Sequence, residues 1–174
     1  RVFRPWDVHA TTQCWRLAME NMDTPTALIF SRQNVNDLPA GTKYSGVEKG
    51  AYEVVAEANS DVVLVASGSE VSTLAEAAAL LAVDGIKARV VSCPSEGLFR
   101  RQSKEYQESI LPSGVKTFAL TAGLPVIFEG LVGANGRVYG LDSFGFSAPF
   151  KVLDEKLGYT AQNMYNEIKK FLAE

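Results

Sequence analysis

The hydrophobic and polar positions in the middle of the chain predict a strand, a helix and a second strand. The apolar run Val62 to Ala66 is too short for a helix and is typical of a strand buried on both faces of a parallel sheet. An alanine-rich stretch with helical periodicity follows it, and Ser67 and Glu70 have the spacing of a capping box at its start. Gly85 is placed to end this helix, and Ile86 to Cys93 returns as the second strand. This order predicts a right-handed βαβ unit, with any ligand at the carboxyl ends of its strands.

A second unit of the same kind is predicted at the start of the chain. Val2 to Trp6 predicts a short strand, and Asp7 is placed as the N-cap of a helix that ends near Asn21. Thr26 to Ser31 predicts another strand of the buried type. Because Arg1 leads straight into the first of these strands, we expect the chain to be a fragment, with this unit incomplete at its front.

The periodic pattern dissolves after this unit into polar turn formers around Pro39, and we interpret residues 35–49 as an interdomain linker. Residues 1–34 are then expected to be the end of one domain. Residues 50–174 are expected to form a second domain, which opens with a strand within Ala51 to Ala58.

Six further elements are predicted after the central unit, and together they complete a soluble α/β fold with a mostly parallel sheet. They are a helix begun by Ser95 and closed by Leu111, a strand over Val115 to Leu120, a short helix among glycines, a strand over Val138 to Leu141, a helix begun by Pro149 and ended by Gly158, and a last helix capped by Thr160.

Composition excludes several classes of function. The 174 residues carry a net charge of -3 with both signs spread along the chain, so we expect neither a nucleic-acid nor a membrane partner. No apolar run approaches the roughly 20 residues of a membrane span, and no signal-peptide pattern opens the chain. We therefore expect a cytoplasmic protein.

The reactive side chains form no recognisable catalytic or metal-binding pattern. Cys14 and Cys93 are far apart and lack ligand spacing, and with His9 as the single histidine we expect no metal site. We interpret both cysteines as buried thiols and His9 as a surface or capping residue rather than a catalytic one.

Two positions are candidates for anion binding. The turn Ser67, Gly68 and Ser69 puts backbone N–H groups at a helix start and could hold an anion. It lacks the lysine and the glycine spacing of a phosphate loop, so a tight strand-to-helix turn without a ligand is the favoured interpretation. Arg32 lies just past a predicted strand, where a guanidinium can grip a phosphate, and a salt bridge to the linker is the alternative. The loop from Phe144 to Pro149 fits either a ligand contact or packing against a neighbour.

Several segments share their residues and their order with one known family. They are Pro25 to Asn34, Gly50 to Tyr52, Ala66 to Val71, Lys87 to Ser92 with Pro94 and Ser95, and Phe144 and Gly145 with Ser147 to Pro149. Through them essentially the whole chain resembles the transketolase family. The resemblance implies a three-layer α/β/α C-terminal domain with a mostly parallel sheet, preceded by a partial βαβ unit of the pyrimidine-binding domain.

The resemblance implies a full-length, homodimeric enzyme that moves two-carbon ketol units between sugar phosphates. Thiamine diphosphate and magnesium would be its cofactors, and the residues that bind them and perform the chemistry would lie upstream of Arg1. This chain alone is then expected to bind neither cofactor and to be inactive. Only Arg32 carries over, as a contact to the substrate phosphate. Between Thr121 and Leu131 the chain departs from the family, because Thr121 stands where the family has glutamate and the usual tryptophan-rich stretch is missing.

Two other classes of function remain open. One is a C-terminal interaction or dimerisation module of another thiamine diphosphate enzyme. The other is an effector-binding domain that uses the turn from Ser67 to Glu70.

Overall fold

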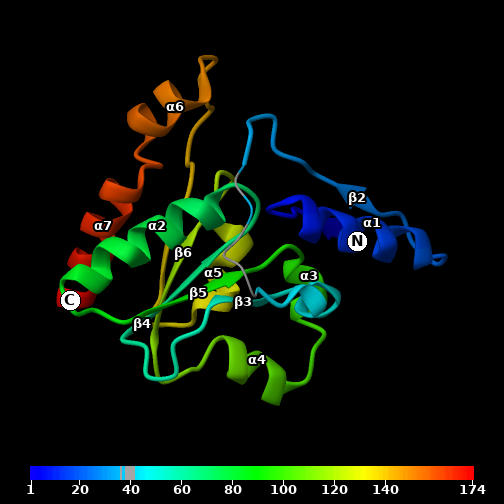
Figure 1. Ribbon diagram of the computed structural model, residues 1–174, viewed down its shortest axis with the longest axis horizontal. Coiled ribbons are helices and arrows are strands. Elements are labelled where there is room, and N and C mark those ends of the chain that lie inside the picture. The colour runs from blue at the N-terminus through cyan, green and yellow to red at the C-terminus, as the bar shows by residue number, and fades with distance from the viewer. Residues whose placement is uncertain (36, 38–41) are drawn as a thin grey trace.

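The computed structural model describes residues 1–35, 37 and 42–174 and arranges their strands in two sheets (Figure 1). A small parallel sheet joins β1 (Val2–Phe3) to β2 (Ala27–Leu28). The larger sheet has the order β3-β5-β4-β6-β7, in which β3 is antiparallel to β5 and the other neighbours are parallel. Its strands are β3 (Tyr52–Val55), β4 (Val62–Ala66), β5 (Ala88–Ser92), β6 (Lys116–Leu120) and β7 (Arg137–Tyr139).

Helices lie between most consecutive strands of the described residues, whereas β3 and β4 are joined by a loop. The helices are α1 (Val8–Glu20), the 3-10 helix η1 (Tyr44–Lys49), α2 (Glu70–Val83), α3 (Glu96–Phe99), α4 (Lys104–Ile110), α5 (Val126–Val132), α6 (Phe150–Leu157) and α7 (Ala161–Ala173). None of these helices is both long and apolar enough to span a membrane.

The larger sheet has a hydrophobic core on each face, which confirms the expected three-layer α/β fold. Alternate side chains of β4 point to opposite faces, as in any strand. Leu64 joins a core with α2 and α7, whereas Val63 and Val65 join a second core with Phe99 of α3 and Phe128 of α5. Both faces are covered, and this is why β4 reads as one continuous apolar run.

The central βαβ unit is confirmed in topology, with one correction at the start of its helix. Gly85 has φ +77°, the left-handed conformation expected at a helix end. The predicted capping box is wrong, because the N-cap is Ser69 and its side chain makes no capping hydrogen bond. The Ser67 hydroxyl accepts a hydrogen bond from Arg4 instead.

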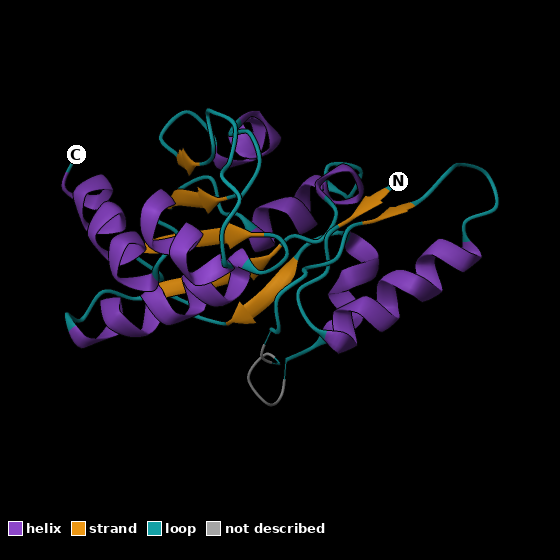
Figure 2. Cartoon of the chain, turned by 90° about the horizontal axis from the view of Figure 1, so that it is seen from above, coloured by secondary structure: helices purple, strands orange, loops and turns teal. Residues whose placement is uncertain are grey.

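The βαβ unit at the start of the chain is also confirmed, and Asp7 caps α1 by accepting a hydrogen bond from the Ala10 N–H. The prediction that its second strand is buried is wrong. Ala27 is exposed and Leu28 only half-buried, because β2 pairs with β1 alone among the described strands. Figure 2 shows the β1–α1–β2 unit to one side of the larger sheet.

The helix predicted from Ser95 to Leu111 is two helices. Helix α3 ends after one turn, and the Ser103 hydroxyl then accepts a hydrogen bond from the Tyr106 N–H as the cap of α4. The last two helices agree with the prediction: Gly158 ends α6 with φ +79°, and the Thr160 side chain caps α7.

The three predicted regions of the chain share one hydrophobic core. Phe3, Trp6 and Cys14 of the first unit belong to the core that contains Leu64 and α2, and so does Val47 of η1, inside the predicted linker. Residues 36 and 38–41 of that linker lie outside the described part of the chain. The division at 1–34, 35–49 and 50–174 stays a prediction.

Candidate functional site

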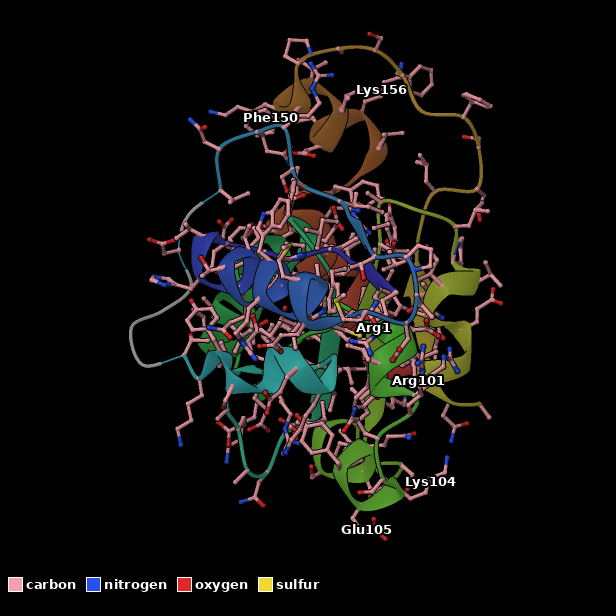
Figure 3. All side chains as sticks on the ribbon, turned by 90° about the vertical axis from the view of Figure 1, so that its right-hand side faces the viewer. Arg1, Arg101, Lys104, Glu105, Phe150 and Lys156 are labelled. Atoms are coloured by element: carbon pink, nitrogen blue, oxygen red, sulfur yellow. The ribbon has the colours of Figure 1, made fainter. Side chains whose placement is uncertain are left out.

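A cavity of about 860 Å³ lies where the segment after β2 meets the start of α2 and the helices α6 and α7. Figure 1 shows the segment after β2 and helix α6 converging above the start of α2. Figure 3, in which Phe150 and Lys156 mark α6, shows the same two segments side by side from another direction. Arg32 lines the cavity on one side, and Gly68 and Ser69 line it on another, so residues from both predicted anion-binding positions face one space.

An ion pair between Arg4 and Glu70 forms part of the cavity wall. Arg4 Nη2 lies 3.1 Å from Glu70 Oε2, and Arg4 Nη1 donates to Ser67 Oγ at 3.1 Å. Glu70 is only 6% exposed, and burial raises the pKa of its carboxyl. The Arg4 charge, the Ser69 hydroxyl and the Ala122 N–H oppose this rise. Arg4 therefore already has a partner and is not free to bind a ligand anion.

The sequence analysis missed this pair and gave Glu70 a different role. The two side chains are 66 positions apart, and no local spacing links them. The only signals available were an arginine at the end of a predicted strand and a carboxylate at a buried helix start.

The turn at Ser67, Gly68 and Ser69 is engaged by the same pair. The Gly68 N–H donates to the Arg4 carbonyl oxygen at 3.0 Å, so one of its backbone donors is already used. The Glu70 carboxylate also lies beside the turn and repels a second anion. Anion or effector binding by this turn stays a prediction.

Arg32 is exposed and, within the described residues, makes no hydrogen bond or ion pair. The alternative of a salt bridge to the linker therefore has no support from the part of the linker that is described. Its guanidinium can turn into the cavity with all of its donors available. The role of Arg32 as a phosphate contact stays a prediction that this geometry permits.

Helix α6 adds charged side chains of both signs to the cavity. The cavity is lined by Lys151, Asp154 and Glu155 of α6 and by Glu76 of α2. Burial raises the pKa of the Asp154 carboxyl. Cations for a phosphate and carboxylates for hydroxyl groups are thus present in one space.

The remaining candidates lie outside this cavity. The His9 ring packs against Tyr44, with centroids 5.2 Å apart. Cys14 and Cys93 are buried as predicted, and burial raises the pKa of each thiol to about 12, so neither is a nucleophile at neutral pH. Among the described residues, no group of three or more His, Cys, Asp or Glu side chains could hold a metal ion.

Two loops singled out from the sequence have distinct surroundings. In the loop from Phe144 to Pro149, Lys156 Nζ lies 4.4 Å from the centre of the Phe146 ring, while Phe144 is exposed; a ligand contact and packing both stay open. In the stretch that departs from the family, Thr121 is fully buried and its carbonyl oxygen accepts a hydrogen bond from the Tyr159 hydroxyl at 2.7 Å.

Comparisons with known proteins show which family this chain belongs to by similarity of sequence and structure. Residues 50–160 match the family model described as "Transketolase-like TK C-terminal domain". A curated transketolase of Staphylococcus aureus (strain MW2) is 43% identical over 171 residues, which are 96% of this chain and 26% of that protein. The chain thus spans about a quarter of the length of such relatives.

Solved structures agree with that match. Transketolase from Leishmania mexicana has a TM-score of 0.92 at 35% identity, over 99% of this chain and 25% of that one. A Pichia stipitis transketolase in complex with sedoheptulose-7-phosphate has a TM-score of 0.89 at 32% identity, over the same shares of the two chains.

Proposed function

The chain belongs to the transketolase family and carries its C-terminal domain, and from this premise we propose that it is part of an enzyme that transfers two-carbon ketol units between sugar phosphates. The names of its relatives support this proposal, and so does the relative solved with sedoheptulose-7-phosphate. The whole enzyme is proposed to be a cytoplasmic homodimer that uses thiamine diphosphate and magnesium.

Within that enzyme, residues 1–34 end the pyrimidine-binding domain, 35–49 are the linker, and 50–174 are the C-terminal domain. Both cofactors are proposed to be held by parts of the whole enzyme outside this chain. Among the described residues, no group of three or more His, Cys, Asp or Glu side chains could hold a metal ion. Thiamine diphosphate would supply the carbanion chemistry. The contribution of this chain is to hold the substrate and to support the fold.

Arg32 is the residue to which we assign substrate binding. Arg32 lines a cavity of suitable size, and its guanidinium has no partner among the described residues; this is the observation that carries the assignment. A planar guanidinium can hold two phosphate oxygens at once, which fixes the far end of a sugar phosphate. The carbons that react are then held in a constant orientation, while Arg32 itself takes no part in bond making.

Kinetics of Arg32→Ala in the whole enzyme test the assignment. Losing a charge-assisted contact of about 1.5 to 3 kcal/mol should raise KM for phosphorylated sugars roughly ten- to a hundredfold. The unphosphorylated donor hydroxypyruvate should be almost unaffected. Arg101→Ala is the matched control, because Arg101 is exposed and lies away from the cavity, and within the described residues its side chain bonds only to the Gly97 carbonyl oxygen. An equal loss with hydroxypyruvate would assign Arg32 to the fold instead.

The 174-residue chain alone, supplied with thiamine diphosphate and magnesium, should transfer no ketol group. Detectable transfer by the purified chain would contradict the proposal that the cofactors and the catalytic residues belong to other parts of the enzyme.

A further inference from the structure

We propose that the 3-10 helix η1 is a clamp that keeps the β1–α1–β2 unit closed against the larger sheet, and that the hydrogen bond from the Tyr44 hydroxyl to the Asp7 carboxylate controls it. The sequence pattern placed η1 in a linker, whereas the structure packs it into the core through Val47. The described residues that line the cavity include neither Asp7 nor any part of η1, so the clamp is independent of the function proposed for Arg32.

One end of η1 holds the start of α1. The Tyr44 hydroxyl donates to Asp7 Oδ2 at 2.5 Å, and the Tyr44 ring lies against the His9 ring with centroids 5.2 Å apart. Asp7 is only 1% exposed, and its other oxygen, Oδ1, accepts from the Ala10 N–H at 2.8 Å as the N-cap of α1. One buried carboxylate therefore both begins α1 and binds η1.

The other contacts between η1 and α1 are weaker or less directional. Arg16 Nη2 lies 3.5 Å from Glu48 Oε2, but both side chains are about half exposed, and such pairs contribute little. Val47 shares a core with Cys14, and apolar packing has no preferred direction. The bond between Tyr44 and Asp7 is buried at its acceptor and is charge-assisted, so it is the contact that fixes how α1 sits on η1.

The other end of η1 is attached to the helices beside the larger sheet. Lys49 Nζ lies 4.4 Å from the centre of the Tyr106 ring on α4. Gly50 ends η1 with φ +89°, and its carbonyl oxygen accepts from the Ser95 N–H at 3.1 Å, just before α3. These contacts include no residue of the first unit, so η1 can stay in place when that unit moves.

Helix α1 depends on η1 more than on any other described helix or strand. Figure 3 shows η1 directly below α1, and η1 is the principal neighbour of α1 in the described part of the chain. Strand β1 has separate attachments through Arg4, as described above. Release of the clamp would therefore free α1 first and expose Cys14 beneath it. Because Arg4 and the segment after β2 line the cavity, full opening of the unit would also remove one of the cavity walls.

Labelling of Cys14 by a disulfide reagent tests the clamp. In the Cys93→Ala background Cys14 is the only thiol of the chain, and it is buried, so it reacts only after the structure around it opens. Tyr44→Phe keeps the ring and removes the hydroxyl. It should raise the labelling rate at least about tenfold, because a hydrogen bond to a charged group is then missing from the closed state. An unchanged rate would overturn the proposal.

Tyr165→Phe is the chemically matched control. The Tyr165 hydroxyl also donates to a carboxylate at 2.5 Å, that of Asp84, but this bond joins α7 to the end of α2. It stays intact when only the first unit opens, so Tyr165→Phe should leave the labelling rate of Cys14 within about twofold. Equal acceleration by both tyrosine variants would mean that Cys14 reacts only when the whole chain unfolds, and the clamp would be refuted.

Phe128→Leu controls for global stability. Phe128 is buried in the core on the other face of the larger sheet, away from Cys14. The variant should lower the urea midpoint of the chain but leave the labelling rate of Cys14 unchanged, because it weakens no contact of the first unit. If the labelling rate followed the urea midpoint across all three variants, the first unit would have no opening of its own and the proposal would be wrong.

Asp7→Asn tests whether the two side chains act as a pair. Asparagine can still cap α1, but it no longer offers a charged acceptor to the Tyr44 hydroxyl. The proposal requires that the double variant Asp7→Asn, Tyr44→Phe accelerate labelling by less than the product of the two single effects, since both remove the same bond. Effects that multiply would show that the two side chains act independently, and η1 would then not clamp α1 through this bond.

Discussion

The chain contains two βαβ units, β4–α2–β5 and β1–α1–β2, which share a connectivity and differ in enclosure. All five residues of β4 are buried, since β5 and β6 flank the strand and helices cover both of its faces. Among the described strands, β2 pairs with β1 alone. Helix α1 buries Ala10, Cys14 and Leu17 on one face, but Met19 on the other face is 72% exposed.

The difference shows that connectivity and burial have separate physical causes. A strand, a helix and a second strand follow from local periodicity, which each segment carries by itself. Burial depends on how many neighbours a strand acquires, and that number is set by the rest of the fold. On the outer face of α1, Trp15 and Met19 are exposed, and among the described strands β2 has β1 as its single neighbour.

The largest contrast is expected from truncating one apolar side chain in each unit. Leu64→Ala removes a fully buried side chain from β4 and should lower the free energy of unfolding by about 3 to 4 kcal/mol. Met19→Ala removes an exposed side chain from α1 and should change it by less than about 0.5 kcal/mol. Urea denaturation of the chain followed by circular dichroism measures both. Similar losses in the two variants would mean that α1 is enclosed as fully as β4.

The next prediction concerns the ion pair that joins the two units. Arg4→Leu leaves the Glu70 carboxylate buried without its counter-charge and should cost about 2 to 3 kcal/mol at pH 8. Arg4→Leu combined with Glu70→Leu should recover much of this loss, because no unpaired charge remains. If the double variant is as unstable as the single one, the pair contributes packing rather than charge.

The same variant has a defined pH dependence. Burial raises the pKa of Glu70 in the folded protein, and removing the Arg4 charge should raise it further. The folded carboxyl then holds its proton more tightly than the unfolded one, so stability is greatest below the unfolded pKa and falls as the pH rises through the folded pKa. The loss in free energy of unfolding caused by Arg4→Leu should therefore become smaller as the pH is lowered from 8 to 5. If that loss became larger toward pH 5, the Glu70 carboxylate would not be the unpaired charge that destabilises the variant.

Much of the fold could be predicted because its signals are local. The continuous apolar run of β4, the glycines that end α2 and α6, and the capping threonine of α7 are each readable from a few neighbouring residues. The break between α3 and α4 was not readable. Its apolar side chains continue at helical spacing across the break, and only the Ser103 hydroxyl bond marks the new start.

The candidate site was predictable only in its parts. Arg32 and the turn at Ser67 to Ser69 were each placed at the carboxyl end of a strand, but nothing local says that the two ends meet. Their meeting depends on how β1 sits against the larger sheet. Two backbone hydrogen bonds of Arg4 fix that position. The Arg4 N–H donates to the Pro94 carbonyl oxygen, and the Arg4 carbonyl oxygen accepts from the Gly68 N–H. Contacts between residues so far apart in sequence leave no periodic trace.

The smallest predicted difference uses the two cysteines as probes, one in each unit. Cys14 on α1 and Cys93 after β5 are both buried, and burial raises the pKa of each thiol to about 12, so a disulfide reagent can label them only after the structure opens. In the opened state both thiols regain a pKa near 8.5, and the ratio of their labelling rates then reports only how often each unit opens.

Because α1 is exposed on its outer face, we expect the Cys93→Ala variant, which keeps Cys14, to be labelled at least about tenfold faster than Cys14→Ala, which keeps Cys93. Below pH 8 both rates should rise about tenfold per pH unit with an unchanged ratio, since the reactive species is the thiolate. Urea denaturation of each variant provides the control, because a difference in global stability would also change the rates. Equal rates at equal stability would mean that the two units open together, as their shared core around Leu64 permits, and the contrast between them would then be one of exposure alone.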